Sequence, residues 1–194
     1  MGDHRDTPAE RVAHAVRQWG PDRVVRVAGE TLATDPAEVV SGEPLELITL
    51  LRTDIVSGIA ERSETRDWLA GGKPPGHRYW ARVWACRAFL YVWDDSAGPA
   101  VVAALDDDHW RVRELAGKVI ARREVPDAAD RLAELAAGDP VPRVRAAACR
   151  ALSVVGEGEH LPVLAAAADT SDRLVAAAAE QALDRIRRRL DRDP

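Results

Sequence analysis

Aromatic and basic side chains recur in this 194-residue chain at intervals of about thirty residues. Indole rings and guanidinium groups are the side chains that most often dominate binding hot spots in protein interfaces. Equal spacing predicts that each of these residues belongs to one copy of a repeated element. Side chains at the same position of successive copies then form a row. The two rows are Trp80, Arg111, Arg143 and Arg173, and, seven residues further along, Arg87, Lys118 and Arg150.

The chain offers no constellation typical of catalysis. It contains no Gly-x-Ser-x-Gly motif, no cysteine matched to a histidine, and five scattered histidines. The segment GGKPPG (71–76) has no Ser or Thr after Lys73, so it is a linker rather than a phosphate loop. The acids of DDDH (106–109) are interpreted as turn formers. We therefore expect no catalytic residue, no metal, no cofactor and no enzymatic activity.

Charge and composition narrow the class of partner and the compartment. The formal net charge of −5 disfavours a dedicated nucleic-acid binder. Only Lys73 and Lys118 are lysines; the arginine bias is typical of a GC-rich bacterial genome, with arginine-specific recognition as the alternative. Without an apolar run of about 18 residues or a signal peptide, we expect a cytoplasmic protein that does not enter a membrane.

Three segments align in register: ARVWACRAFLYV (81–92), VRELAGKVIARR (112–123) and VRAAACRALSVV (144–155), with LVAAAAEQALDR (174–185) as a looser fourth. An apolar helix and then an acidic turn precede the last three, the helices at 98–105, 127–137 and 160–168. Asp107, Asp139 and Asp169 have the chemistry of turn formers and helix N-caps. The pattern predicts two helices per repeat. Cys86 and Cys149 then lie two repeats apart, too far for a disulfide.

The segment 139–169 resembles a HEAT repeat of the short, alanine-rich kind found in phycobilisome lyases. The resemblance rests on Asp139, Val144-Arg145, Ala148 and Ala151-Leu152. It implies an all-α, right-handed α-solenoid of HEAT-like helical pairs, whose second helices stand side by side along a concave face. The expected pieces are 77–95, 96–125, 126–156 and 157–190. The resemblance also implies that Arg82, Arg113 and Arg145 pair with turn acids of a neighbouring repeat.

Residues 1–76 do not follow the repeat, and we expect a divergent helical cap packed on the repeats of 77–194. Segment 7–20 predicts a helix that begins at Thr7 and ends at Gly20. Segment 21–34 fits either a second helix or a short strand. Segment 44–62 predicts a long helix, with Leu47, Leu51 and Ile55 spaced by four.

The register separates core positions from exposed ones. Apolar equivalents predict that six residues of the first repeat are buried: Ala81, Trp84, Ala85, Ala88, Phe89 and Val92. Positions with polar equivalents, Tyr91 among them, are expected at the surface. Those predicted to bind a partner are Tyr79, Trp80, Arg87, Trp110, Arg111, Lys118, Arg143 and Arg150.

The favoured interpretation is a non-enzymatic scaffold or adaptor that holds an acidic protein or peptide in the concave groove, as a monomer or weak homodimer. One alternative is that the arginines are merely solvated and bind nothing. Another is nucleic-acid binding: Trp80, Arg87, Asp94 and Trp110 are similar in type to the residues that HEAT-like alkylpurine DNA glycosylases use. A third is a lyase-like or chaperone-like subunit, as the phycobilisome resemblance implies.

Overall fold

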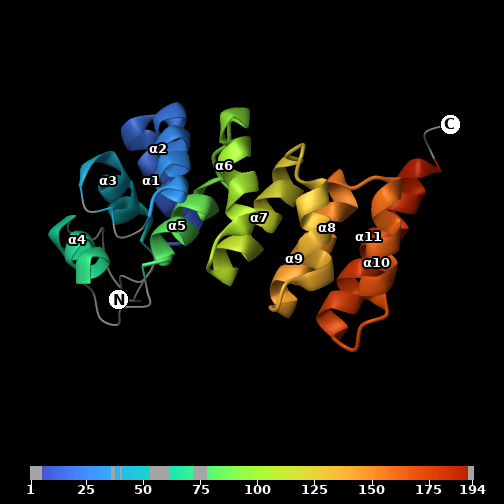
Figure 1. Cartoon of the computed structure of the whole chain (residues 1–194). Helices are drawn as coiled ribbons and strands as arrows, with labels where there is room; N and C mark the ends of the chain where they lie inside the picture. Colours follow the sequence, from blue (N-terminus) through green and yellow to red (C-terminus); the bar gives the residue numbers. More distant parts are fainter. Residues whose placement is uncertain (1–5, 36–37, 40, 53–61, 72–77, 192–194) are drawn as a thin grey trace, which may run out of the picture. The chain divides into compact units, whose positions relative to one another are not determined.

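The computed structural model describes residues 6–35, 38–39, 41–52, 62–71 and 78–191, and within these ranges the chain forms helices and no strand. It divides into two compact units, an N-terminal unit, Met1–Val101, and a C-terminal unit, Val102–Pro194 (Figure 1). The predicted all-α class is confirmed. The boundary predicted between residues 76 and 77 stays a prediction.

The N-terminal unit is built from α1 (Pro8–Trp19), α2 (Pro21–Ala33), α3 (Gly42–Leu51), α4 (Arg62–Gly71) and α5 (Trp80–Ala88). Thr7 and Glu10 cap α1 reciprocally, through side chain and backbone. Gly20 adopts a φ of 81°, open to glycine at little cost, and this turns the chain directly into α2. Segment 21–34 is therefore a helix, and the strand alternative is wrong.

Helix α3 corrects one prediction. The expected helix over 44–62 stops at Leu51, and residues 53–61, including Ile55, lie outside the described part of the chain. Arg52 leaves the helical conformation with a ψ of 130°. Its buried guanidinium donates a hydrogen bond to Thr65 Oγ1 and lies 5.2 Å from the centre of the Trp68 ring. Arg52 thus contacts α4 at the point where α3 ends, which the apolar spacing did not predict.

Helix α5 packs against α1, α2 and α3, so the first repeat rests on the N-terminal helices as expected. All six predicted core residues are buried, and Trp84 is only 3% exposed. Tyr91 is exposed, as its register predicted. The helix is shorter than expected, because the chain turns at Phe89, Leu90 and Tyr91 through tighter backbone hydrogen bonds to residues three positions earlier. Phe89 then packs edge-on against Trp93.

The chain continues through η2 (Asp95–Ala97), α6 (Gly98–Ala103) and η3 (Ala104–Asp106) into the repeats of the C-terminal unit. The second helices of the repeats are α7 (Trp110–Arg123), α9 (Pro142–Val155) and α11 (Arg173–Leu190). The first helices are α8 (Ala129–Gly138) and α10 (Leu161–Ala168), the latter preceded by η4 (Gly158–His160).

These helices form two layers within the C-terminal unit. Helix α9 packs between α7 and α11, and the second layer is formed by α8 against α9 and α10 against α11. Where α7 meets α9 the side chains are small: a Cβ atom added to Gly117 would lie 3.5 Å from Ala147. The paired helices and their starting positions match the predicted HEAT-like arrangement.

Candidate functional site

Trp110 is the centre of the candidate site in the C-terminal unit. It is the first residue of α7, and its ring is partly exposed. The Arg111 guanidinium carbon lies 4.5 Å from the ring centre, and that of Arg143, from α9, lies 5.6 Å away. The His109 ring stacks on Trp110 at 6.0 Å. Two arginines from different repeats thus share one aromatic ring, an arrangement in which cation–π attraction holds both groups at the surface.

Glu114 lies one turn further along α7 and joins the same cluster. Its side chain is 11% exposed, and its Oε1 accepts hydrogen bonds from Lys118 Nζ at 2.8 Å and from Arg143 Nε at 3.2 Å. Two cations therefore converge on one largely buried carboxylate, and this ties α7 to α9. Arg143 itself remains 57% exposed and Lys118 46% exposed, so both groups stay accessible to a partner.

Arg150 lies on α9, seven residues after Arg143, and two helical turns place the two side chains on one stripe of the helix. It is exposed and makes no ion pair with the described residues. The structure thus brings Trp110, Arg111, Lys118 and Arg143 together and sets Arg150 on the same stripe of α9. We call these five residues, together with Glu114, the α7–α9 face.

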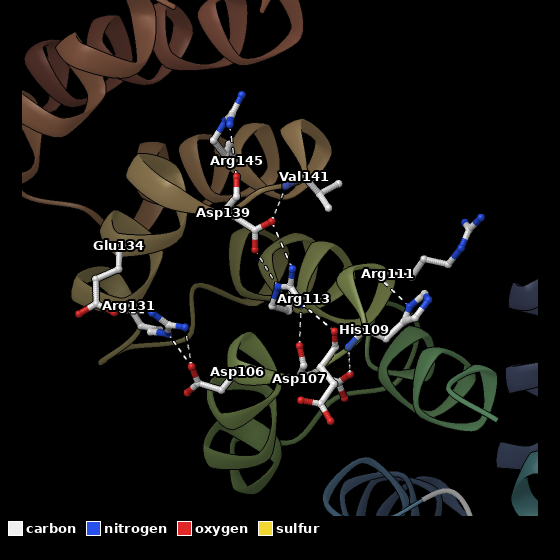
Figure 2. A network of polar contacts seen from close by, with 11 residues as sticks. Asp106, Asp107, His109, Arg111, Arg113, Arg131, Glu134, Asp139, Val141 and Arg145 are labelled. Atoms are coloured by element: carbon white, nitrogen blue, oxygen red, sulfur yellow. Dashed lines mark hydrogen bonds and ion pairs between the residues drawn. The ribbon is translucent and has the colours of Figure 1, made fainter. Parts of the chain in front are cut away.

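A second polar network lies at the turns between the helices of the repeats (Figure 2). Arg113 donates two hydrogen bonds to the Asp139 carboxylate, at 2.7 and 3.2 Å, and one to the Asp107 carbonyl oxygen at 2.8 Å. The Arg113 side chain is 13% exposed and that of Asp139 is 2% exposed. The predicted pairing with the turn acid of a neighbouring repeat is confirmed for Arg113. Arg145 differs, since it donates to the Asp139 carbonyl oxygen in its own repeat.

The acidic turns serve structure. Asp107 and Asp139 each accept a hydrogen bond from the backbone N–H two residues later, so both are turn formers as expected. In the last repeat the N-cap is Asp172, which accepts from Leu174 and Val175, and not Asp169, which ends α10. Asp106 pairs with Arg131 at 2.7 Å. Figure 2 shows Arg111 pointing away from this network.

The other predicted site residues belong to the N-terminal unit. The Tyr79 and Trp80 rings stack at 5.4 Å, Trp80 lies 5.9 Å from Trp84, and Trp84 lies 5.4 Å from Trp68 of α4. Tyr79 and Trp80 are therefore the outer, partly exposed end of an aromatic column whose inner member is Trp84. Arg87 is half-buried on α5. A partner-binding role for Tyr79, Trp80 and Arg87 stays a prediction.

Two further observations bear on chemistry. Within the described ranges, no three His, Cys, Asp or Glu side chains lie close enough to hold a metal ion, and no helix has the length and apolarity to cross a membrane. Cys86 and Cys149 are both buried, and among the described residues neither takes part in a disulfide, as expected. Burial raises the pKa of the Cys149 thiol to about 11, against the opposing effect of nearby Arg150 and Arg145.

Sequence reasoning missed Glu114. The register gives Val83, Ala146 and Ala176 as its equivalents, so the position counts as apolar core. A single charged residue in an otherwise apolar series was the available signal, because a buried charge needs a partner. Two cationic neighbours, Lys118 four residues on and Arg143 in the next repeat, supply that partner.

Comparison with known proteins agrees with the helical pairs. Neither curated protein sequences nor solved structures give a match to this chain. The family model for HEAT repeats matches residues 80–184, which is more than half of the chain and includes α5 through most of α11. With its paired helices, its arginine–aspartate links between repeats and this match, the chain belongs to the HEAT-repeat family.

Proposed function

We propose that this protein is a non-enzymatic interaction module whose α7–α9 face binds an acidic segment of a partner protein. HEAT repeats generally act as protein-interaction scaffolds. The observation that carries the proposal is the position of Trp110, whose ring is shared by the guanidinium groups of Arg111 and Arg143. A partly exposed tryptophan held by arginines combines the residue types of a binding hot spot in one place.

The charge of the α7–α9 face supports an acidic partner. The α7–α9 face carries four cations and one carboxylate, that of Glu114, on a chain whose formal net charge is −5. Glu114 accepts hydrogen bonds from Lys118 and Arg143, so it reduces the local excess of positive charge without removing it. Arg150 adds a charge that no described acid offsets. Carboxylates of a partner can pair with such arginines bidentately.

The same charges are the reason to test nucleic acid as the competing ligand. Phosphate contacts would make binding weaken steeply with salt, because each neutralised phosphate releases condensed counterions. Contacts anchored on Trp110 would weaken less. The chain's overall acidity disfavours a long polyanion, which would also meet the remaining negative surface.

The test is fluorescence anisotropy with two labelled probes, a peptide of about ten residues rich in Glu and Tyr and a single-stranded oligonucleotide of equal extended length. The variant R111E/R143E should weaken peptide binding at least about tenfold, because it reverses both charges at Trp110. The matched control is R17E/R66E, which reverses the charge of two exposed arginines in the N-terminal unit. It should leave the affinity nearly unchanged.

Three results would contradict the proposal. The peptide fails to bind the wild type, both variants lose binding equally, or the oligonucleotide binds more tightly with a steep salt dependence. Circular dichroism and thermal unfolding of R111E/R143E must match the wild type, so that a loss of affinity reports the face and not the fold. If that variant unfolds, Trp110→Ala, which leaves the Glu114 ion pairs intact, takes its place in the same assay.

A further inference from the structure

A cleft of about 850 Å³ lies in the C-terminal unit, where the carboxyl ends of α7 and α9 meet the last turns of α11. Its size falls within the range of pockets that hold small molecules or several residues of a peptide. All but one of its lining residues are polar or charged, and no part of the proposed function uses it. Its lining residues are Glu124, Val154, Gln181, Asp184, Arg185, Arg188 and Arg189.

The extra length of α11 supplies part of the lining of the cleft. It has 18 residues, whereas α7 and α9 have 14 each. The additional turns carry Arg189 to the end of α9, where its guanidinium donates to the carbonyl oxygens of Val154 and Gly156. Those carbonyls lack partners within their own helix, so Arg189 completes the end of α9 and fixes the last turns of α11.

Arg185 and Arg188 are the chemically available groups of the cleft. They lie three residues apart on α11, a spacing that makes them neighbours on the helix surface. Both are exposed, and neither makes an ion pair or side-chain hydrogen bond with the described residues. Since Arg189 is engaged at the end of α9, these two guanidinium groups are the ones that face an incoming ligand.

The cleft continues from the α7–α9 face. On α9, Val154 lies four residues after Arg150 and eleven after Arg143, which places all three on one stripe of the helix. At 1.5 Å per residue, Arg143 and Val154 are about 16 Å apart along the helix axis. An extended peptide covers that distance in about five residues. One short segment can therefore reach both the Trp110 cluster and the cleft.

The mixed lining indicates the chemistry of the occupant. Arg185 and Arg188 suit carboxylates, while Glu124, Asp184 and the Gln181 amide offer acceptors for backbone N–H groups. A polypeptide carries both kinds of group. The phosphate groups of a nucleic acid are acceptors only, so its backbone offers no donor to Glu124 and Asp184.

We propose that this cleft is a second subsite for the acidic segment bound at the α7–α9 face. The partner is then an extended peptide with two acidic clusters about five residues apart, one at Arg111 and Arg143, the other at Arg185 and Arg188. This inference rests on the proposed function, and it adds the length and the spacing that the partner must have.

The test compares two labelled peptides of equal composition in the anisotropy assay, one with its acidic clusters about five residues apart and one with them adjacent. R185E/R188E should weaken the spaced peptide about tenfold and change the affinity of the adjacent peptide less than about twofold. The variant keeps Arg189, so the end of α9 stays capped, and R17E/R66E again controls for net charge.

The outcomes separate the two proposals. If R185E/R188E leaves the spaced peptide unaffected while R111E/R143E weakens it, the second subsite is wrong and the proposed function stands. If neither variant weakens either peptide, both proposals are wrong. Equal weakening of both peptides by R185E/R188E would mean general electrostatic attraction and would overturn the second subsite, as would tighter binding of the oligonucleotide than of the spaced peptide.

Discussion

Helix α5 in the N-terminal unit meets α4 through large rings, whereas α7 and α9 in the C-terminal unit meet through glycine and alanine. Trp84 is buried between Trp68 and Trp80, at 5.4 and 5.9 Å. Gly117, in contrast, faces Ala147 directly across the α7–α9 contact. Helices of unlike length and spacing leave irregular space that aromatic rings fill, whereas repeated helices at equal spacing pack closely with small side chains.

The difference extends to the polar contacts. Small side chains bury little area and slide past one another easily, so they fix the register of two helices only weakly. In the C-terminal unit that role falls to the forked hydrogen bonds from Arg113 to Asp139 and to the Glu114 cluster. The comparison predicts that the stability of the N-terminal unit depends on the volume of its buried rings. The stability of the C-terminal unit should depend on the geometry of its polar contacts.

Trp84→Ala should have the largest effect. Removing a buried indole leaves a cavity against Trp68, and substitutions of this kind cost about 3–5 kcal/mol. Urea unfolding of the variant measures the loss. A decrease below about 1 kcal/mol would show that the aromatic column is not the main support of this unit. Hydrogen exchange should locate the loss of protection in the N-terminal unit.

Asp139→Ala should cost slightly less, about 3 kcal/mol, because it leaves the buried Arg113 without its carboxylate. The Asp107 and Asp108 carbonyl oxygens still accept from Arg113, which limits the penalty. The measurement is again the free energy of unfolding, with Arg131→Ala as the control, since that arginine makes more exposed ion pairs. An equal cost for both variants would refute a special role for the Arg113–Asp139 pair.

The pH dependence of stability tests whether the Cys149 thiol is buried away from water. The pKa of the thiol is about 11 in the folded chain and near the ordinary value of 9.0 in the unfolded chain. Its contribution to the free energy of unfolding is therefore complete below pH 9 and is lost between pH 9 and 11. At pH 10 the loss should be about 1 kcal/mol. Cys149→Ala should remove this part of the pH dependence. Parallel stability curves for both proteins from pH 8 to about pH 11 would contradict the buried thiol.

Gly117→Ala is the smallest change and should stabilise the protein. The new methyl group would meet Ala147 at ordinary contact distance, 3.5 Å, while alanine favours a helix interior over glycine by about 0.5–1 kcal/mol. Gly117→Leu is the counterpart, because its larger side chain has no such space and should destabilise. The melting temperatures of the two variants should therefore shift in opposite directions. Destabilisation by alanine would contradict the space between Gly117 and Ala147 on which this prediction rests.

The repeat made much of residues 77–194 predictable. Equal spacing placed the starts of α7, α9 and α11, and it separated buried Trp84 and Phe89 from exposed Tyr91 because each position has equivalents that report its surroundings. Residues 1–76 have no such equivalents, so the apolar spacing of Leu47, Leu51 and Ile55 led to a helix that is too long. At the end of α3, Arg52 contacts Thr65 and Trp68, residues that no local pattern brings near it.

The candidate site was predictable only in part. The rows of arginines identified Arg111 and Arg143 as surface groups, but their convergence on Trp110 depends on the packing of α7 against α9. Glu114 was hidden by its apolar equivalents. Arg185 and Arg188 were not among the predicted site residues, because the capping of α9 by Arg189, which positions them, joins residues more than thirty positions apart.

The short sequence range of the polar links has a consequence for folding. Arg113 reaches Asp139 over 26 residues, Arg143 reaches Glu114 over 29, and Arg189 reaches Val154 over 35. Each link joins adjacent repeats, so stability in this unit is a sum of neighbouring interfaces, as in a one-dimensional array. Such an array frays from its ends. Detachment of α11 would remove the cleft while α7, α9 and the Trp110 cluster remain folded, so a partial unfolding event would switch one subsite off and leave the other intact.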